Sequence, residues 1–360
     1  MQPAPDAVHD LLALGWRDDA RACEVVAAIS TGRLARVSAQ HRSGYIAATA
    51  IDHEFPVQPP AAWTRRDCAP DRRAVVGDWV LLEPARDHIA SLLPRRSLLQ
   101  RAAAGESYRR QPIAANVDTV FVVSGLDLDF NPRRLERYLV LVRASGAQPV
   151  LVLTKLDKHA EVDSDTELAG IAALDVPIVR VNAKDALSVA VLHPWLGPGC
   201  SVALVGSSGA GKSTLTNTLL GSERMKTAAV RTHDARGRHT TTHRALLALP
   251  QGGVLIDSPG MRQIKPTGEE DLDQGGFEDI EALAGQCRFR DCAHGAEPGC
   301  AVRAALAAGT LDAARLHNYR KLALEVKAAA QGFASKQVKR ASGRAGDRRA
   351  PVPRTPSAGR

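Results

Sequence analysis

The stretch that most constrains this chain runs from residue 206 to residue 214 and reads Gly-Ser-Ser-Gly-Ala-Gly-Lys-Ser-Thr. It fits the phosphate-loop pattern G-x-x-x-x-G-K-[ST]. A short apolar run, Ser201–Val205, precedes it, and Leu215–Leu220 suits the first turns of a helix. Strand, glycine-rich loop and helix are the context in which this pattern binds phosphate, so a glycine-rich turn with a chance lysine is the weaker interpretation.

Each part of this loop has an expected role toward a nucleoside triphosphate. Glycines let successive backbone N–H groups point at phosphate oxygens, and the following helix N-terminus adds partial positive charge. We expect Lys212 to reach the β- and γ-phosphates and the Ser213 hydroxyl to bind Mg²⁺, which gives both residues catalytic roles. The predicted nucleotide-binding residues of the loop are Gly206, Ser207, Ser208, Gly209, Ala210, Gly211, Lys212, Ser213 and Thr214.

The length and composition fit a soluble protein of two or three domains. The chain has 360 residues, of which 44% are hydrophobic and 24% charged. No apolar run approaches the length of a membrane span. Residues 1–16 lack the basic start and long apolar core of a signal peptide, so we expect a cytoplasmic protein that does not bind membranes.

Much of the net charge of +8 comes from the C-terminal segment. Residues 336–360 contain eight Lys or Arg against a single acid, Asp347. Because residues 331–360 are also poor in large apolar side chains, the sequence predicts a disordered basic tail. Such a tail suits a polyanion such as RNA, although a solvated tail that only aids solubility remains an alternative.

Residues 31–100 predict a small β-barrel that follows an N-terminal extension of residues 1–30. Gly32–Ser38, Gly44–Ala50 and Val75–Leu82 look like short strands separated by turn residues. We expect an OB-fold, a fold that often binds oligonucleotides. Its aromatic residues are expected in the core: Tyr45, Trp63 and Trp79. Its positive charge comes from Arg33, Arg36, Arg42, Arg65, Arg66, Arg72 and Arg73.

From about residue 112 the chain alternates between apolar strands and helices. The predicted strands are Thr119–Val123, Pro149–Leu153, Val176–Val181 and Gly253–Asp257, with a helix over Arg133–Arg143. This alternation indicates a parallel α/β sheet that helices cover on both faces. Ligands of such sheets bind at the carboxyl ends of the strands.

Three short motifs stand at those strand ends. They are Thr154-Lys155-Leu-Asp157, Asn182-Ala183-Lys184 and Asp257-Ser-Pro-Gly260. The Asp157 carboxylate matches the N1–H and N2–H₂ donors of guanine, whereas adenine would leave it unpaired. Asp257 can hold Mg²⁺ through water, and the Gly260 N–H can sense the γ-phosphate. Each motif is weak alone, but together with a phosphate loop they predict guanine-nucleotide binding.

A second cluster, near the C-terminus, has the composition of a metal site. Cys287, Cys292, His294 and Cys300 supply three thiolates and one imidazole, a complete tetrahedral set for one structural zinc ion. In a cytosolic chain the pattern favours metal over disulfides, and three reduced cysteines beside a histidine are the weaker interpretation. Helices are expected over 301–308 and 311–328.

The three strand-end motifs resemble known GTPase sequences. Residues 154–157 look like N-K-x-D, residues 182–184 like S-A-K, and residues 257–260 like the D-x-x-G switch. The base motifs precede the phosphate loop, which is the order of the circularly permuted GTPases. With the barrel in front, residues 236–242 after the loop and the cysteine cluster behind, the chain closely resembles the ribosome small-subunit-dependent GTPase A family over residues 30–325.

The resemblance gives further residues a role. Thr154 stands where Asn is usual, which implies weaker nucleotide binding with guanine selectivity retained. Residues 231–243 would form the first switch, in which one of three threonines completes the Mg²⁺ shell: Thr240, Thr241 or Thr242. Met261 replaces the glutamine that orients water in Ras-like enzymes. His239 is therefore a candidate to position water, although contact with RNA or solvent is an equal alternative.

The sequence thus predicts a three-domain GTP hydrolase with a barrel at 31–100, a permuted G domain at 101–265 and a zinc-binding helical domain at 266–330. The resemblance implies binding to the 30S ribosomal subunit through 16S rRNA, a role in its late assembly, and weak hydrolysis until the subunit orders the switches. We expect a monomer. The alternatives are an ATP-using enzyme and a non-catalytic, GTP-gated RNA-binding module, which Met261 favours.

Overall fold

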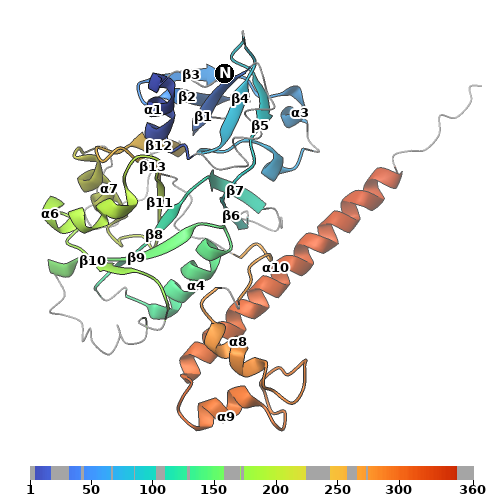
Figure 1. The fold of residues 1–360 in the computed structure, drawn as a ribbon. Helices are drawn as coiled ribbons and strands as arrows, with labels where there is room; N and C mark the ends of the chain where they lie inside the picture. The colour runs from blue at the N-terminus through green and yellow to red at the C-terminus, as the bar shows by residue number, and fades with distance from the viewer. Residues whose placement is uncertain are drawn as a thin grey trace, which may run out of the picture.

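Figure 1 shows the fold of the chain in a computed structural model. The described residues are 5–17, 32–41, 44–65, 68–84, 86–102, 110–127, 130–157, 171, 174–223, 244–257, 266–272 and 275–346. The strands are β1 (Arg33–Gln40), β2 (Tyr45–Ala50), β3 (His53–Val57), β4 (Trp79–Leu82), β5 (Ile89–Leu92), β6 (Leu98–Ala102), β7 (Arg110–Ala115), β8 (Thr119–Gly125), β9 (Gln148–Thr154), β10 (Ile178–Arg180), β11 (Ser201–Val205), β12 (Arg244–Ala248) and β13 (Val254–Asp257).

The helices connect and flank these strands. They are α1 (Pro5–Ala13), α3 (Ala61–Thr64), α4 (Pro132–Arg143), α6 (Ala186–Val189), α7 (Lys212–Leu220), α8 (Glu278–Ala284), α9 (Ala301–Ala307) and α10 (Ala313–Gly346), with 3-10 turns η1 (Pro70–Arg72) and η3 (Ala190–Trp195). None of the helices in the described part of the chain is both long and apolar enough to span a bilayer.

The central sheet runs in the order β10-β9-β8-β11-β13-β12. Its first five strands are parallel, and β12 pairs antiparallel with β13. Helices cover both faces, as predicted, because successive β8 residues alternate between two cores. Val120 and Val122 pack in the cluster that contains Leu139 of α4, whereas Phe121 and Val123 pack with Leu215 of α7.

The first five strands of the chain, β1–β5, form a second unit. They run β3-β2-β1-β4-β5, each antiparallel to its neighbour, and a single parallel bridge joins Gln58 to His88. The buried side chains between them are Ala35, Val37, Tyr45, Ala47, Val57, Ala74, Val80, Leu82 and Ile89. Trp63 packs against this core, and Trp79 is 4% exposed, so the expected burial of the aromatic residues is confirmed.

Strand β1 joins this unit to the central sheet. Its end pairs with β12, with Ala39 opposite Ala245, so the two units share an 11-stranded sheet. Beside this junction the Arg36 guanidinium donates to the carbonyl of Leu14, the hydroxyl of Ser201 at 2.8 Å, and the carbonyls of Gly77 and Asn116, both at 3.1 Å. Arg36 is 0% exposed, so its sequence-based assignment to the positive surface is wrong.

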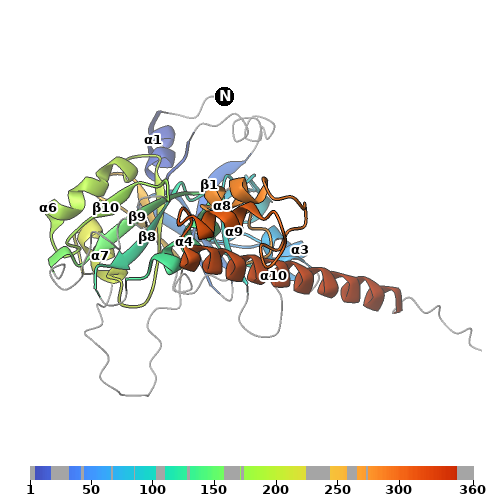
Figure 2. The same ribbon diagram turned by 90° about the horizontal axis from the view of Figure 1, so that it is seen from below.

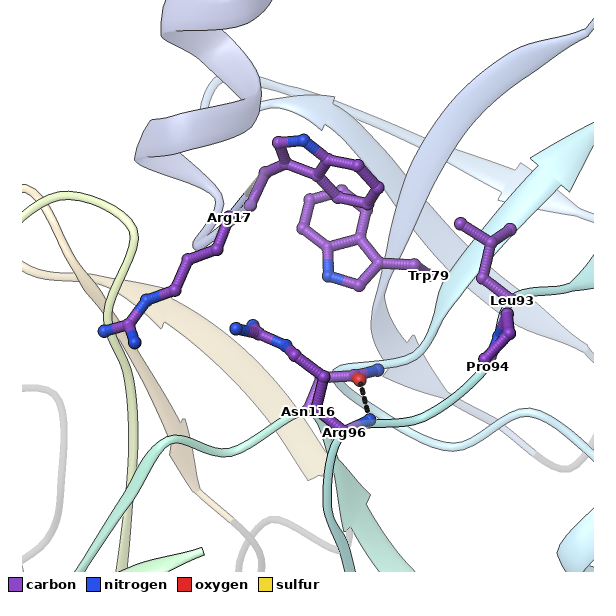
Figure 3. Close-up of a pocket in the computed structure, with 7 residues that line it drawn as sticks. Arg17, Trp79, Leu93, Pro94, Arg96 and Asn116 are labelled. Carbon is purple, nitrogen blue, oxygen red and sulfur yellow. Dashed lines mark hydrogen bonds between the residues drawn. The ribbon is translucent and has the colours of Figure 1, made fainter. Parts of the chain in front are cut away.

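A small hollow lies at the same junction. Figure 3 shows Arg17, Trp79, Leu93, Pro94, Arg96 and Asn116 around it. The Trp16 and Trp79 rings meet edge to face at 4.8 Å, and the Arg96 backbone N–H donates to the Asn116 Oδ1 at 3.0 Å. The cavity measures about 10 Å³, which accommodates about one water. This cavity therefore belongs to the junction between the two units and is too small to be a ligand site.

The C-terminal helices form a third unit that packs on α4. Val140 of α4 lies in one apolar core with Phe277, Ile280 and Leu316. Around it, Glu136 of α4 accepts from the Arg315 Nη1 at 2.9 Å, and the Arg315 Nη2 also pairs with Asp279 at 2.6 Å. Burial alone would raise the pKa of the Asp279 carboxyl, but its hydrogen bonds and attraction to Arg315 outweigh burial and lower that pKa.

Helix α10 corrects the predicted disorder of the tail. It continues without a break to Gly346, and it projects far beyond the other helices in Figures 1 and 2. Residues 331–360 have too few large apolar side chains to build a core of their own, which is why their composition predicts disorder. Once packing has nucleated a helix, each further residue adds to it at little cost in free energy if its helix propensity is high. Ala, Gln, Lys and Arg have high helix propensity. Residues 347–360 lie outside the described part.

Other elements also differ from the sequence-based expectations. Strand β12 and the hairpin of β6 with β7 were not predicted, and the hairpin crosses the expected boundary at residue 100. The predicted strand Val75–Leu82 begins only at Trp79, because Asp78 accepts a hydrogen bond from the Val75 N–H at 2.8 Å and so forms a turn. Gly77 in this turn has φ +91°.

Candidate functional site: a nucleotide pocket and a cysteine cluster

The phosphate loop connects β11 to α7 in a conformation that requires glycine. Gly206, Gly209 and Gly211 have φ values of +146°, +84° and +91°. A Cβ on Gly206 would lie 2.1 Å from the carbonyl oxygen of Val123 in β8, so the loop leaves the sheet against a neighbouring strand. Glycine at these positions gives the loop the tight curvature that a phosphate cradle needs.

Lys212 begins helix α7 and turns back across the loop. Its Nζ donates to the carbonyl of Gly206 at 2.8 Å and also to that of Ser207. The ammonium group is thereby held beside the loop backbone, with Ser213 next to it in the first helical turn. This arrangement places a cation and a hydroxyl at one helix N-terminus, a position that favours the binding of phosphate and Mg²⁺.

Thr154 braces the loop from the neighbouring strand β9. Its side chain is buried, and its hydroxyl donates to the carbonyl of Ala210 at 2.6 Å. Gly211 passes so close that an added Cβ would lie 3.0 Å from the Thr154 Oγ1. The hydroxyl therefore makes a direct contact between the first base motif and the phosphate loop, although a threonine offers fewer hydrogen-bonding groups than an asparagine.

The two base motifs and the loop enclose one cavity of about 160 Å³. Its lining residues are Thr154, Lys155, Asp157, Asn182, Ala183, Lys184, Gly209, Gly211 and Thr214. The structure thus brings together residues that the sequence places more than fifty positions apart. The cavity lies at the carboxyl ends of β9 and β11, as the rule for open α/β sheets predicts.

Helix α7 and a local turn position the second base motif. Thr218 of α7 donates its hydroxyl hydrogen bond to the carbonyl of Ala183 at 2.6 Å. The Asn182 Oδ1 accepts from the Lys184 N–H at 3.1 Å, and the Asn182 N–H donates to the Ser188 Oγ at 2.8 Å. The helix that begins at the phosphate loop therefore also fixes the floor of the base cavity.

Asp127 is a site residue that the sequence analysis missed. Its carboxylate pairs with the Lys155 ammonium group beside the cavity, and Lys155 has φ +61°. Gly125 leaves room for both, since a Cβ there would lie 2.9 Å from the Asp127 Oδ1. Within the described residues Asp157 forms no ion pair, so the Lys155 charge is paired with Asp127 and not with Asp157. An acid just beyond strand β8 was the available signal.

Several predicted site residues cannot be placed. His239, Thr240, Thr241, Thr242 and Gly260 lie outside the described residues, as does Met261. Asp257 is described: it ends β13 and stands opposite Ala245 of β12. Of the residues predicted to bind Mg²⁺, only Ser213 and Asp257 lie among the described residues.

The four predicted zinc ligands meet at one point. Their ligand atoms all lie within 4.8 Å of one another. The Cys287 and Cys300 sulfurs are 3.8 Å apart, and each lies 3.6 Å from the His294 Nδ1. Zinc–sulfur bonds of about 2.3 Å in a tetrahedron give a sulfur–sulfur edge of about 3.8 Å. The donor set and its spacing therefore fit zinc.

The protein holds this cluster in position from two helices. Arg320 of α10 donates to the carbonyl of His294, whose φ is +58°. Cys300 precedes α9, and its sulfur accepts from the Arg303 N–H at 3.4 Å. Desolvation and the neighbouring thiols raise the pKa of Cys292 to about 11. A divalent cation would favour the thiolate form that this environment disfavours.

Comparison with known proteins agrees with this geometry. The RsgA GTPase family matches residues 92–267. A "Small ribosomal subunit biogenesis GTPase RsgA" from Xanthomonas euvesicatoria pv. vesicatoria is 54% identical over 356 residues, 97% of each chain. A protein of the same name from Xanthomonas axonopodis pv. citri is 56% identical over 338 residues, 93% of this chain and 92% of that one.

Two solved structures share the fold. The crystal structure of YjeQ from Thermotoga maritima aligns with a TM-score of 0.59 and 26% identity, covering 82% of this chain and 98% of that one. The structure of YloQ, described as a circularly permuted GTPase, gives a TM-score of 0.57 and 22% identity, covering 87% and 98%.

The order of the motifs on this sheet defines the class of protein. The base motifs after β9 and β10 come before the phosphate loop after β11, yet all three surround one cavity. The chain is a circularly permuted GTPase. At the identity and coverage found, it belongs to the RsgA GTPase family.

Proposed function

We propose that this protein hydrolyses GTP while bound to the small ribosomal subunit and acts in the late assembly of that subunit. The observation that carries the proposal is the shared cavity of the phosphate loop and the guanine motifs, in a chain whose relatives are named small ribosomal subunit biogenesis GTPases. The ATP-using alternative is disfavoured, because the Asp157 carboxylate at this cavity matches guanine donors and not adenine.

In this proposal different residues bind the phosphates, the metal ions and the base. Lys212 and the loop N–H groups hold the phosphates, Ser213 and Asp257 would hold Mg²⁺, and Asp157 reads the base. Bound Mg²⁺ would neutralise developing phosphate charge. His239 remains a candidate to position water, and one of residues 240–242 a candidate Mg²⁺ ligand. Cys287, Cys292, His294 and Cys300 would hold a structural zinc ion that stabilises the fold of the C-terminal unit.

We further propose three functional units: an OB-fold-like barrel at 31–100, the permuted G domain at 101–265 and the zinc-binding helical domain at 266–330. The order β3-β2-β1-β4-β5 with its bridge from Gln58 to His88 supports a closed five-stranded barrel. The barrel and the zinc domain would contact 16S rRNA, and the protein would act as a cytoplasmic monomer.

Co-sedimentation with purified 30S and 50S subunits tests the partner. The protein should pellet with 30S and not with 50S, and more strongly with a non-hydrolysable GTP analogue than with GDP. A ligand shifts an equilibrium only through its different affinity for two states, so the bound subunit must in turn tighten GTP binding. Equal pelleting with both subunits, or with both nucleotides, would refute this proposal.

A further inference from the structure

An exposed tip lies between two ligands of the cysteine cluster. Arg288, Phe289 and Arg290 follow Cys287 directly, and all three side chains are exposed. The Phe289 side chain is 42% exposed, which makes it one of the few large apolar side chains at the surface of the described residues. A single exposed apolar side chain is common at protein surfaces, so what Phe289 can bind depends on the residues around it.

Hydrogen bonds hold the backbone of this tip in place. The Arg288 N–H donates to the carbonyl of Gly299 at 3.1 Å, and the Cys292 N–H donates to the carbonyl of Phe289 at 3.3 Å. Gly299 has φ +74° and lies under the tip, so a Cβ there would approach the Arg288 Cβ to 3.1 Å. The aromatic ring is therefore displayed from an ordered loop, which lowers the entropy lost when a partner binds.

The tip arginines are not paired with carboxylates. Neither Arg288 nor Arg290 has an ion-pair partner in the described part of the chain, and the Arg288 guanidinium lies over the Phe289 ring, 5.6 Å from its centroid. By contrast, the arginines at the α4–α10 contact are paired with carboxylates: Arg133 with Asp312, Arg137 with Glu325, and Arg315 with Asp279. One acid, Asp291, adjoins the tip and leaves it with a net positive charge.

This combination has a defined recognition chemistry. An exposed ring stacks on a nucleobase that is not already paired, and flanking guanidinium groups bind the adjacent phosphates or extend the stack. A protein partner would also cover the ring, but two unpaired cations favour a polyanion. We infer that residues 288–290, the RFR tip, bind an unpaired nucleotide of the small-subunit RNA by stacking on Phe289. This inference rests on the proposed function.

The test uses the full-length protein and purified 30S subunits. Phe289→Ala should weaken binding about tenfold, which corresponds to about 1.4 kcal/mol, whereas Phe289→Tyr should keep it, because base stacking on one aromatic ring contributes about that much. The matched control is Leu324→Ala, which removes an apolar side chain 68% exposed on α10, beside Glu325, and should leave binding unchanged. Changing Arg288 and Arg290 together to Gln should weaken binding and flatten its salt dependence.

Chemical probing of the bases of 16S rRNA in the same complexes identifies the partner. At least one unpaired base should lose reactivity with the wild-type protein and Phe289→Tyr and regain it with Phe289→Ala. Wild-type affinity in Phe289→Ala overturns the inference, as does weaker binding without any change in base reactivity, which would indicate a protein contact. If the wild-type protein does not bind 30S at all, the proposed function fails instead. Unchanged basal GTP hydrolysis and metal content verify that each variant is folded.

Discussion

Asp157 ends the motif that follows β9, and its carboxylate lines the base cavity beside Lys155 and Asn182. Three residues earlier, Thr154 connects the same motif to the phosphate loop. At the scale of single residues, the base cavity and the phosphate loop are thus connected through one tetrapeptide. Substitutions in it should affect nucleotide choice and nucleotide affinity separately.

We predict that Asp157→Asn weakens GTP binding up to about 100-fold, since the amide keeps one acceptor oxygen and loses one charge-assisted hydrogen bond, which contributes about 1.5–3 kcal/mol. The amide offers a donor where guanine also has one, so the variant should shift its preference toward xanthine nucleotides. Calorimetric titration with GTP and with xanthosine triphosphate measures both effects. Unchanged GTP affinity in this variant would show that Asp157 does not read the base.

A second prediction concerns Asp127, which pairs with Lys155. Asp127→Ala should release the lysine to pair with Asp157 and lower GTP affinity about fivefold, the effect of losing about 1 kcal/mol at a partly exposed ion pair. The Asp127→Glu variant should regain part of the lost GTP affinity. The matched control is Asp87→Ala, which removes an exposed ion pair with Arg33 of β1. Equal GTP affinity in Asp127→Ala and Asp87→Ala would contradict a positioning role.

At the scale of secondary-structure elements, the cysteine cluster ties α9 and α10 together through Cys300 and Arg320. The apolar core of this unit is small and shares Val140 of α4 with the G domain. A metal ion that crosslinks four ligands would therefore contribute much of the stability of the unit.

We predict one tightly bound zinc ion per chain. Cys292→Ser should lose most of it, and chelation should unfold α8 and α9 while GTP binding in the G domain survives. Metal analysis of the purified protein and limited proteolysis with and without chelator measure the two effects. Cys68→Ser is the control, because Cys68 is a free thiol outside the cluster. Full zinc content in Cys292→Ser would exclude this cluster as the site.

The elements also show how far sequence reasoning reaches. The strand, loop and helix at 201–220 could be predicted because glycine positions and apolar periodicity are local signals. The meeting of the base motifs at one cavity, and of three cysteines with His294 at one point, could be predicted because their residue types carry the chemistry. Strand β12 could not, since it is defined by pairing with β13 and β1 rather than by its own pattern.

Two misreadings have a common physical cause. Arg36 and the segment 331–346 were interpreted from their composition, which suggests a surface charge and a disordered tail. Arg36 is instead buried among carbonyl and hydroxyl acceptors supplied by four segments distant in sequence. Helix α10 is nucleated where its turns at Leu316 and Leu322 pack into the core of the C-terminal unit. Tertiary context, which a single segment does not contain, decides both cases.

At the scale of the whole molecule, Arg36 connects the unit of strands β1–β5, the N-terminal helix and the central sheet to one another. Burial lowers the pKa of Arg36 to about 9, although attraction to Asp118 opposes this, so the side chain remains cationic at neutral pH. Removing it would leave several buried acceptors without a donor at once.

We predict that Arg36→Met lowers the free energy of unfolding by about 3–5 kcal/mol, the usual effect of breaking a buried, hydrogen-bonded charge. The control on the same strand is Arg33→Met, whose ion pair with Asp87 is exposed and should contribute less than about 1 kcal/mol. Urea denaturation of the two variants compares them directly. Similar denaturation midpoints for both variants would mean that Arg36 does not stabilise the junction between the two units.

The most direct test of the central claim measures GTP hydrolysis by the full-length protein alone, with 30S subunits and with 50S subunits. The permuted G domain should hydrolyse GTP slowly alone, because Met261 offers no group to orient water, and at least about tenfold faster with 30S. Lys212→Ala should abolish the stimulated rate. A rate that 30S leaves unchanged, or that 50S raises equally, would contradict a small-subunit-dependent GTPase.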